Sequence, residues 1–243
     1  MKSSHKEARL LVFDWDGTLM DSETQIVGCL QAASRDLDLE HRDEAACRDI
    51  IGLGLREAVT SLYPDSDDDF VARYTERYRH HWFATEDSRL FPGARETLEH
   101  LHAEGYLLAV ATGKGRAGLD KVLEATGLGG LFAATRCADE TCSKPDPRML
   151  QELMTELKTA PGETLMVGDT EYDMAMACSA GAGPIAVSYG VHAPERLLRY
   201  DPLACLAAIG EFTPWLVEHR SQDPGKAESL SSKRLDQRLP AES

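Results

Sequence analysis

Two aspartates, Asp14 and Asp16, stand two residues apart, directly after a short apolar run and before Gly17. One carboxylate in such a pair can attack a substrate while the other moves a proton. A second pair, Asp169 and Asp173, follows another apolar run and adds oxygen ligands for a hard cation such as Mg²⁺. The four aspartates therefore predict metal-assisted chemistry on an anionic substrate.

Two further polar segments contain groups that suit phosphate. Thr112 and the backbone N–H groups after it, beginning with Gly113, can donate hydrogen bonds to phosphate oxygens. Lys144 can balance negative charge between an anionic substrate and a carboxylate. Lys114 is a candidate substrate contact, although a solvated side chain explains it equally well. Thr112 also suits a helix N-cap, so its residue type alone does not decide its role.

The elements that must position these residues follow from the apolar pattern. Short runs that are apolar on both faces predict buried parallel strands at 10–13, 107–111, 164–167 and 185–187, with a weaker one at 132–135. Helical spacing between them predicts helices at 94–104, 118–126 and 147–158. This alternation predicts a doubly wound α/β fold, a Rossmann-like parallel sheet whose carboxyl edge collects the polar segments.

One interval lacks a buried strand and carries helical patterns at 22–37, 43–51, 55–62 and 67–83. We interpret it as an α-helical cap at 21–88, inserted into a catalytic core formed by 1–20 and 89–220. The tail at 221–243 is polar and without periodicity, which predicts flexibility. In the last cap helix, Phe70, Tyr74, Tyr78 and Trp82 recur every four residues, and this stripe is interpreted as helix packing.

The segment Gly52-Leu53-Gly54 lies between two predicted cap helices. A glycine-rich turn there can bend toward the active site and exclude water, although a plain helix connection is an equal alternative. Arg56, just beyond, is a candidate ligand for a substrate carboxylate or a second phosphate, because guanidinium binds planar anions through two parallel hydrogen bonds.

The composition narrows the classes of function. The formal net charge of −15 over 243 residues argues against a nucleic-acid surface and against attraction to anionic lipid. No apolar run is long enough to span a bilayer or to form a signal-peptide core, which predicts a cytoplasmic protein. The six scattered cysteines form no C-x-x-C pair and no H-E-x-x-H is present, so neither a disulfide framework nor a zinc site is expected. The sequence leaves the oligomeric state open.

The stretches DWDGTLMDSE at 14–23 and GDTEYD at 168–173, with Thr112 and Lys144 between them, resemble the haloacid dehalogenase superfamily. The closest resemblance is to its phosphoglycolate phosphatase-like branch, which carries a small helical cap. It covers about residues 9–200, with four motifs in the right order. Trp15 departs from the Phe common in the branch.

The resemblance implies a Mg²⁺-dependent phosphatase that hydrolyses a small phosphate monoester through an aspartyl-phosphate on Asp14. It further implies that Asp16 moves the proton and lends the metal its backbone carbonyl. Asp169 would bind the metal directly and Asp173 would assist. As in other members of the family, Thr112 and Gly113 would bind the transferring phosphoryl group and Lys144 would stabilise its charge.

Several alternatives remain at this stage. A haloacid dehalogenase or a phosphonatase would lack the second aspartate, so Asp16 argues against both. A sugar phosphomutase of the β-phosphoglucomutase type keeps both aspartates and the same cap, and pyrophosphate is a further possible substrate. A non-catalytic phosphate-binding regulatory module is disfavoured because none of the catalytic residue types is missing. The physiological substrate is not readable from one sequence.

Overall fold

The computed structural model describes residues 8–85 and 88–221. At its centre lies a six-stranded sheet, in the order β5-β4-β1-β6-β7-β8, in which every neighbouring pair runs parallel. The strands span Leu10–Phe13 (β1), Leu107–Thr112 (β4), Ala134–Cys137 (β5), Thr164–Gly168 (β6), Gly183–Val187 (β7) and Ala204–Leu206 (β8). The chain moves outward from β1 in both directions, so the strand order reverses there. The predicted doubly wound α/β class is confirmed.

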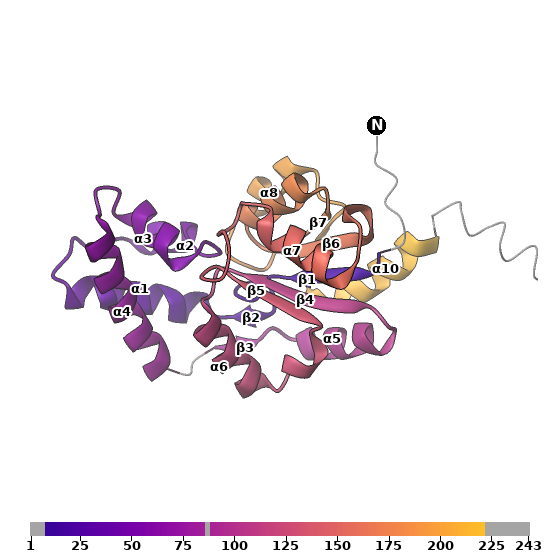
Figure 1. The fold of residues 1–243 in the computed structure, drawn as a ribbon, viewed down its shortest axis with the longest axis horizontal. Helices are drawn as coiled ribbons and strands as arrows, with labels where there is room; N and C mark the ends of the chain where they lie inside the picture. The colour runs from indigo at the N-terminus through magenta and orange to yellow at the C-terminus, as the bar shows by residue number, and fades with distance from the viewer. Residues whose placement is uncertain (1–7, 86–87, 222–243) are drawn as a thin grey trace, which may run out of the picture.

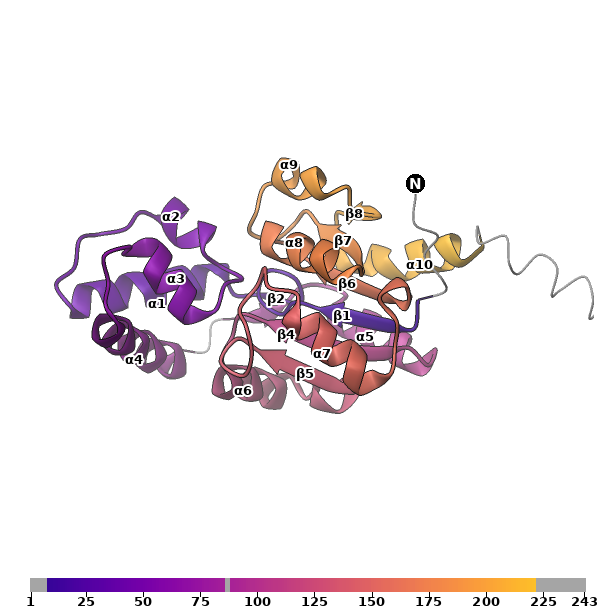
Figure 2. The same cartoon turned by 45° about the horizontal axis from the view of Figure 1, so that its top comes forward.

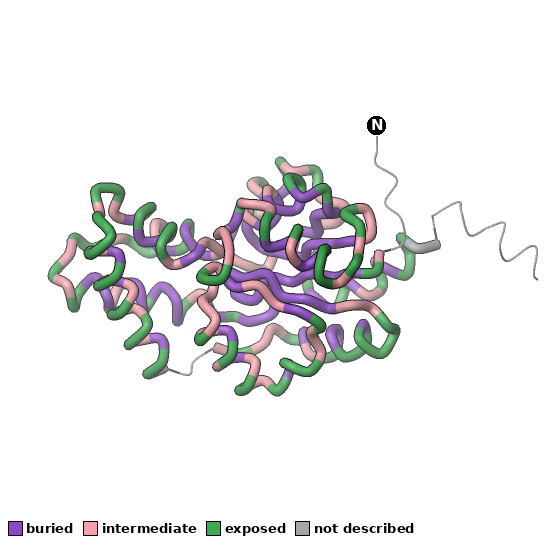
Figure 3. The backbone as a smooth tube through the Cα atoms, viewed as in Figure 1, coloured by how far each residue is buried: buried purple, intermediate pink, exposed green. Residues whose placement is uncertain are grey.

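Helices cover both faces of the sheet (Figures 1 and 2), and alternate side chains of the central strands belong to different core clusters. In β1, Leu11 and Phe13 belong to one core cluster, whereas Leu10 and Val12 belong to the other. Both faces are therefore buried, as Figure 3 shows for the central strands, which explains their continuous apolar sequence. One layer consists of α5 (Ala94–Ala103), α6 (Arg116–Thr126) and α10 (Phe212–Ser221), and the other of α7 (Arg148–Leu157) and α8 (Glu171–Ala180).

Four helices form a separate group beyond the carboxyl edge of the sheet (Figure 1). They are α1 (Glu23–Asp36), α2 (Glu44–Asp49), α3 (Leu55–Leu62) and α4 (Asp68–Ala84). We refer to residues 21–88 as the cap and propose that its boundaries lie at two short strands, β2 (Met20–Asp21) and β3 (Arg89–Leu90). These strands pair with each other antiparallel, so the chain leaves the core and returns to it at one place.

The aromatic stripe of α4 serves two purposes. Tyr74 is fully buried inside the cap, where its hydroxyl donates to the carbonyl of Leu30 at 2.8 Å. Further along the same helix, Tyr78 and Trp82 stack nearly parallel at 6.4 Å between ring centroids and line a cavity that reaches the first aspartates. The interpretation as helix packing therefore holds for Tyr74 but is incomplete for the last two rings.

Several elements differ from the sequence-based expectation. The weak strand lies at 134–137 rather than 132–135, and α6 begins at Arg116 rather than at residue 118. The edge strand β8, the short pair β2–β3, and the helices α8 and α9 (Pro194–Leu197) were not predicted. The predicted flexible tail, apart from Ser221, lies outside the described residues. No helix in the described ranges has both the length and the apolar character needed to cross a bilayer.

Candidate active site

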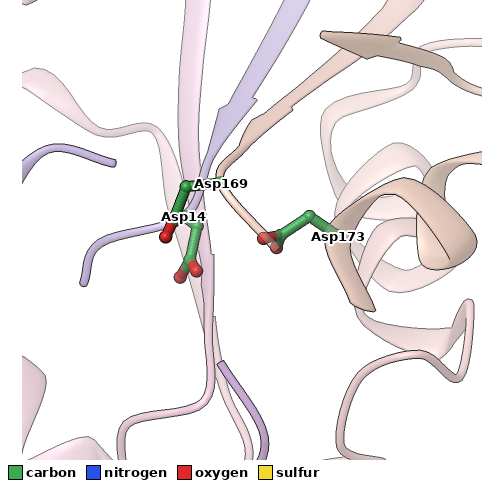
Figure 4. Close-up of side chains that lie close together, drawn as sticks. All are labelled: Asp14, Asp169 and Asp173. Atoms are coloured by element: carbon green, nitrogen blue, oxygen red, sulfur yellow. The ribbon is translucent and has the colours of Figure 1, made fainter. Parts of the chain in front are cut away.

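Three aspartates from two neighbouring strand ends and one helix meet at the carboxyl edge of the sheet (Figure 4). Asp14 follows β1, Asp169 follows β6, and Asp173 comes from the first turn of α8. One carboxylate oxygen of each lies within 4.8 Å of the others, and all three side chains are buried. Because β1 and β6 are paired in parallel register, their ends necessarily place Asp14 beside Asp169. We call these three residues the carboxylate cluster.

Asp14 has one engaged and one free carboxylate oxygen. Its Oδ1 accepts a hydrogen bond from the N–H of Trp15 at 2.6 Å and lies 2.8 Å from Nζ of Lys144. Its Oδ2 is buried and has no hydrogen-bond partner among the described residues. Burial raises the pKa of Asp14 well above its ordinary value, and the charge of Lys144 only partly opposes this. A buried carboxylate oxygen without a partner is costly unless a cation or a substrate completes it.

Asp169 is held by donors from two distant segments. The hydroxyl of Thr18 donates to Oδ1 at 2.7 Å, and the N–H of Val191 donates to Oδ2 at 2.8 Å. Burial, followed by the charge of Asp173, raises the pKa of Asp169 to about 7. Gly17 has a φ of +77°, and a Cβ on it would stand 2.1 Å from Oδ2 of Asp169. The glycine is thus required both by the turn and by the close approach of the carboxylate.

Lys144 bridges the cluster. Its Nζ lies 2.8 Å from Asp14 Oδ1 and 2.7 Å from Asp173 Oδ1, and its side chain is fully buried. Burial alone would lower the pKa of Lys144, but the two carboxylates outweigh it and raise the pKa above its ordinary value. Asp173 is also tied to the start of α8 by a capping box, in which the N–H of Thr170 donates to its Oδ2 at 3.1 Å and its own N–H donates to the hydroxyl of Thr170 at 3.3 Å. Asp173 therefore serves both the helix start and the cluster.

The side chain of Asp16 points elsewhere. Its Oδ1 accepts a hydrogen bond from the hydroxyl of Ser22 and forms an ion pair with Nζ of Lys114 at 3.0 Å. Nζ of Lys114 also lies 3.6 Å from the ring centroid of Trp82 in α4, a cation–π contact. The Lys114 side chain is only 7% exposed, so the structure gives it these contacts instead of a solvated position.

Thr112 is the last residue of β4, the strand next to β1, and Gly113 follows it. The hydroxyl of Thr112 accepts a hydrogen bond from the N–H of Lys114 at 3.2 Å. Because α6 begins at Arg116 with Gly115 at its N-cap, Thr112 is not the cap of that helix.

The turn Gly52-Leu53-Gly54 reaches the core. A Cβ on Gly113 would stand 2.3 Å from the carbonyl oxygen of Leu53, so only glycine allows this approach. The N–H of Gly54 donates to the hydroxyl of Ser143 at 2.7 Å, next to Lys144. The turn therefore lies against Gly113 and Ser143 of the core rather than merely joining two helices.

Arg56 lies on the cavity wall, but within the described ranges it forms no ion pair with the carboxylate cluster. Its guanidinium pairs instead with Asp68 at 2.7 Å on an exposed surface.

Sequence reasoning missed several residues that build the site. Thr18 stands inside the first motif, and Thr170 begins the T-x-x-D pattern of a capping box, so both had a readable local signal. Ser22, which donates to Asp16, stands within the same motif at 14–23, whereas Val191, which donates to Asp169, had no such signal because only the fold brings it there. A second contact between cap and core was also missed, in which Arg196 pairs with Asp49 of α2 and with Glu171 of α8.

Comparison with known proteins supports the family resemblance that the sequence motifs indicate. The model of the haloacid dehalogenase-like hydrolase family matches residues 11–187. The probable phosphatase IndB of Dickeya dadantii is 36% identical over 208 residues, covering 83% of this chain and 90% of that protein. A phosphoglycolate phosphatase of Vibrio vulnificus is 30% identical over 210 residues, covering 82% and 92%. A crystal structure of a predicted phosphoglycolate phosphatase from Haemophilus somnus superposes with a TM-score of 0.75 at 25% identity, covering 86% and 98%.

The fold, the strand-end aspartates and these relatives all indicate the same family. The expected class of phosphoric monoester hydrolase is confirmed by the family model and by relatives named as phosphatases. On this basis the chain belongs to the haloacid dehalogenase-like hydrolases.

Proposed function

We propose that this protein is a Mg²⁺-dependent phosphatase that hydrolyses a small phosphate monoester through a covalent aspartyl-phosphate on Asp14. The observation that carries the proposal is the free Oδ2 of Asp14, buried in the carboxylate cluster at the end of β1. Asp14 also lines a cavity of about 680 Å³ that gives a substrate access. A nucleophile needs one such oxygen that no protein donor occupies.

The residues present fit a hard divalent cation. Asp14, Asp169 and Asp173 offer only carboxylate oxygens, which Mg²⁺ prefers. A cation would also offset the burial and the mutual repulsion that raise the pKa values of Asp14 and Asp169. We infer that Asp14 and Asp169 hold the ion, that Asp173 assists, and that Asp16 adds its backbone carbonyl. Bound Mg²⁺ would supply charge neutralisation for the phosphate oxygens.

The residues of the chain then divide the reaction. A carboxylate oxygen of Asp14 attacks phosphorus, the phosphorus–ester oxygen bond breaks, and Asp16 gives its proton to the departing alcohol oxygen. In the second half, Asp16 takes a proton from a water molecule that attacks the aspartyl-phosphate, which releases phosphate and restores Asp14. Asp16 is free of the carboxylate cluster and touches Ser22 and Lys114 instead, which suits a group that must turn toward the leaving oxygen.

The remaining groups stabilise charge. Lys144, in contact with Asp14, offsets the negative charge that gathers as phosphorus is transferred. Thr112 and the N–H of Gly113 follow β4 on the same sheet edge and would donate to the phosphoryl oxygens. The turn 52–54 lies against Gly113 and would exclude water from this segment.

The test is hydrolysis of p-nitrophenyl phosphate by the purified protein with MgCl₂ and with EDTA. We expect release of free phosphate only with the metal, and loss of turnover in both Asp14→Asn and Asp16→Asn. Reduction of the quenched enzyme with borohydride should convert Asp14 to homoserine, detectable by mass spectrometry, because an acyl phosphate is reducible.

Other outcomes would point elsewhere. Conversion of a sugar phosphate to its isomer, dependent on a bisphosphate, would indicate a phosphomutase. A wild type that binds phosphate as well as Asp14→Asn but hydrolyses nothing would indicate a binding module.

A further inference from the structure

The cavity that ends at Asp14 and Asp16 extends far into the cap. Its volume of about 680 Å³ is in the range of pockets that hold drug-sized molecules, and it much exceeds a phosphoryl group with a two-carbon acid. Beyond the aspartates its walls are largely apolar and come from three cap helices: Ile26 and Leu30 of α1, Ala58 of α3, and Val71, Tyr78 and Trp82 of α4.

Basic residues on the cavity wall are already paired. Lys114 pairs with Asp16 at 3.0 Å, Arg56 with Asp68 at 2.7 Å, and Arg79 with Asp139 at 3.9 Å. In the described part of the chain, the wall therefore presents no cation without an acidic neighbour.

Further acids line the same cavity. Glu57 and Glu76 lie on its wall, and neither forms an ion pair with any residue that the structure describes. A second anionic group on the substrate, such as a carboxylate or another phosphate, would meet net negative charge there, which disfavours its binding.

Trp82 adds a specific feature to the apolar wall. Its indole is 4% exposed and lies among the residues that line the cavity. The ring of Tyr78 stacks nearly parallel to this indole, at 6.4 Å between ring centroids, and also lines the cavity.

From these observations we propose that the preferred substrate is the phosphate monoester of an uncharged alcohol that carries a flat aromatic group. Small carboxylated phosphates and bisphosphates are then poor substrates. This inference rests on the proposed phosphatase function and specifies its substrate class. The aromatic group would lie along Trp82 and Tyr78 while the phosphoryl group meets Asp14.

The test compares kcat/KM for 2-naphthylmethyl phosphate and 2-phosphoglycolate with MgCl₂ present. Both release a primary alcohol, so differences in leaving-group ability are small. We expect the naphthylmethyl ester to be preferred by at least about tenfold, the scale of selectivity that added apolar contact gives. Equal or better hydrolysis of 2-phosphoglycolate would overturn the inference while leaving the phosphatase proposal intact. Absence of turnover with either ester and with p-nitrophenyl phosphate would instead overturn the phosphatase proposal.

Variants of Thr75 test the charge argument directly. Thr75 is a half-buried residue of α4 on the cavity wall and plays no part in the proposed chemistry. Thr75→Arg adds a cation to the wall, and Thr75→Met is its neutral control. We expect Thr75→Arg, but not Thr75→Met, to raise kcat/KM for 2-phosphoglycolate by about fivefold or more, the scale of a charge-assisted contact. No gain in a folded, p-nitrophenyl phosphate-active Thr75→Arg protein would contradict the proposed role of charge.

Discussion

Replacing Lys144 with Met should destabilise the protein strongly in the absence of metal. The lysine side chain is fully buried, and its Nζ lies 2.8 Å and 2.7 Å from the carboxylates of Asp14 and Asp173. Methionine fills a similar volume but leaves two buried carboxylates without their cation. Breaking a buried ion pair in this way costs about 3–5 kcal/mol in the free energy of unfolding. Phosphatase turnover should also fall by roughly 10²–10³, as when one charge-stabilising donor is removed.

The assay is urea denaturation at pH 7 in EDTA, followed by the far-UV circular dichroism signal. Lys121→Met is a matched control, because its Nζ contacts backbone carbonyls and the ring of Phe83 but forms no ion pair with a carboxylate in the described part of the chain. We expect that control to lose about 1 kcal/mol, the worth of an ordinary hydrogen bond. The double variant Lys144→Met/Asp173→Asn should recover part of the loss, since one of the uncompensated charges is gone. A loss no larger than that of Lys121→Met, with no recovery in the double variant, would refute this account of the cluster.

Three other predictions concern the same site. Without metal, the free energy of unfolding should fall as the pH rises, because Asp14 and Asp169 must ionise while buried. The fall should begin near pH 4, where an unfolded aspartate titrates, and continue through about 7, the raised pKa of Asp169. Urea titrations at several pH values, with and without MgCl₂, should show that the metal reduces this dependence on pH. Gly17→Ala places a Cβ against Asp169 at a positive φ, so thermal unfolding should reveal a loss of about 1–3 kcal/mol, and the MgCl₂ concentration needed for half-maximal turnover should rise. Lys114→Met removes the ion pair to Asp16 and should lower kcat for p-nitrophenyl phosphate; an unchanged kcat would show that this pair does not position Asp16.

The sequence predicts the carboxyl-edge residues well because their positions follow from topology. Once 10–13, 107–112 and 164–168 are parallel strands of one sheet, their polar ends must share an edge. The helix α8 escaped prediction because Met174, Met176 and Ala177 spread apolar groups over several of its faces, so no single stripe is visible. The edge strand β8 is only three residues long and carries little signal.

The residues that line the cavity could not be predicted from the sequence for a different reason. Helical periodicity indicates which residues share a face but not what that face meets. Tyr74 and Trp82 share one stripe of α4, yet Tyr74 packs inside the cap and Trp82 faces the cavity. Likewise, the contact of Lys114 with the ring of Trp82 depends on how the cap lies over the core.

The paired strands β2 and β3 make the cap separable from the chemistry. Met20 faces Leu90 and Asp21 faces Arg89, so the two points at which the insertion joins the core are adjacent. A short hairpin turn could in principle replace the whole insertion without altering the order of any strand in the main sheet. The carboxylate cluster is built entirely outside the insertion, whereas most of the apolar cavity wall belongs to it. Evolution, or an engineer, can therefore exchange one recognition surface for another at this junction and keep the same phosphoryl-transfer machinery.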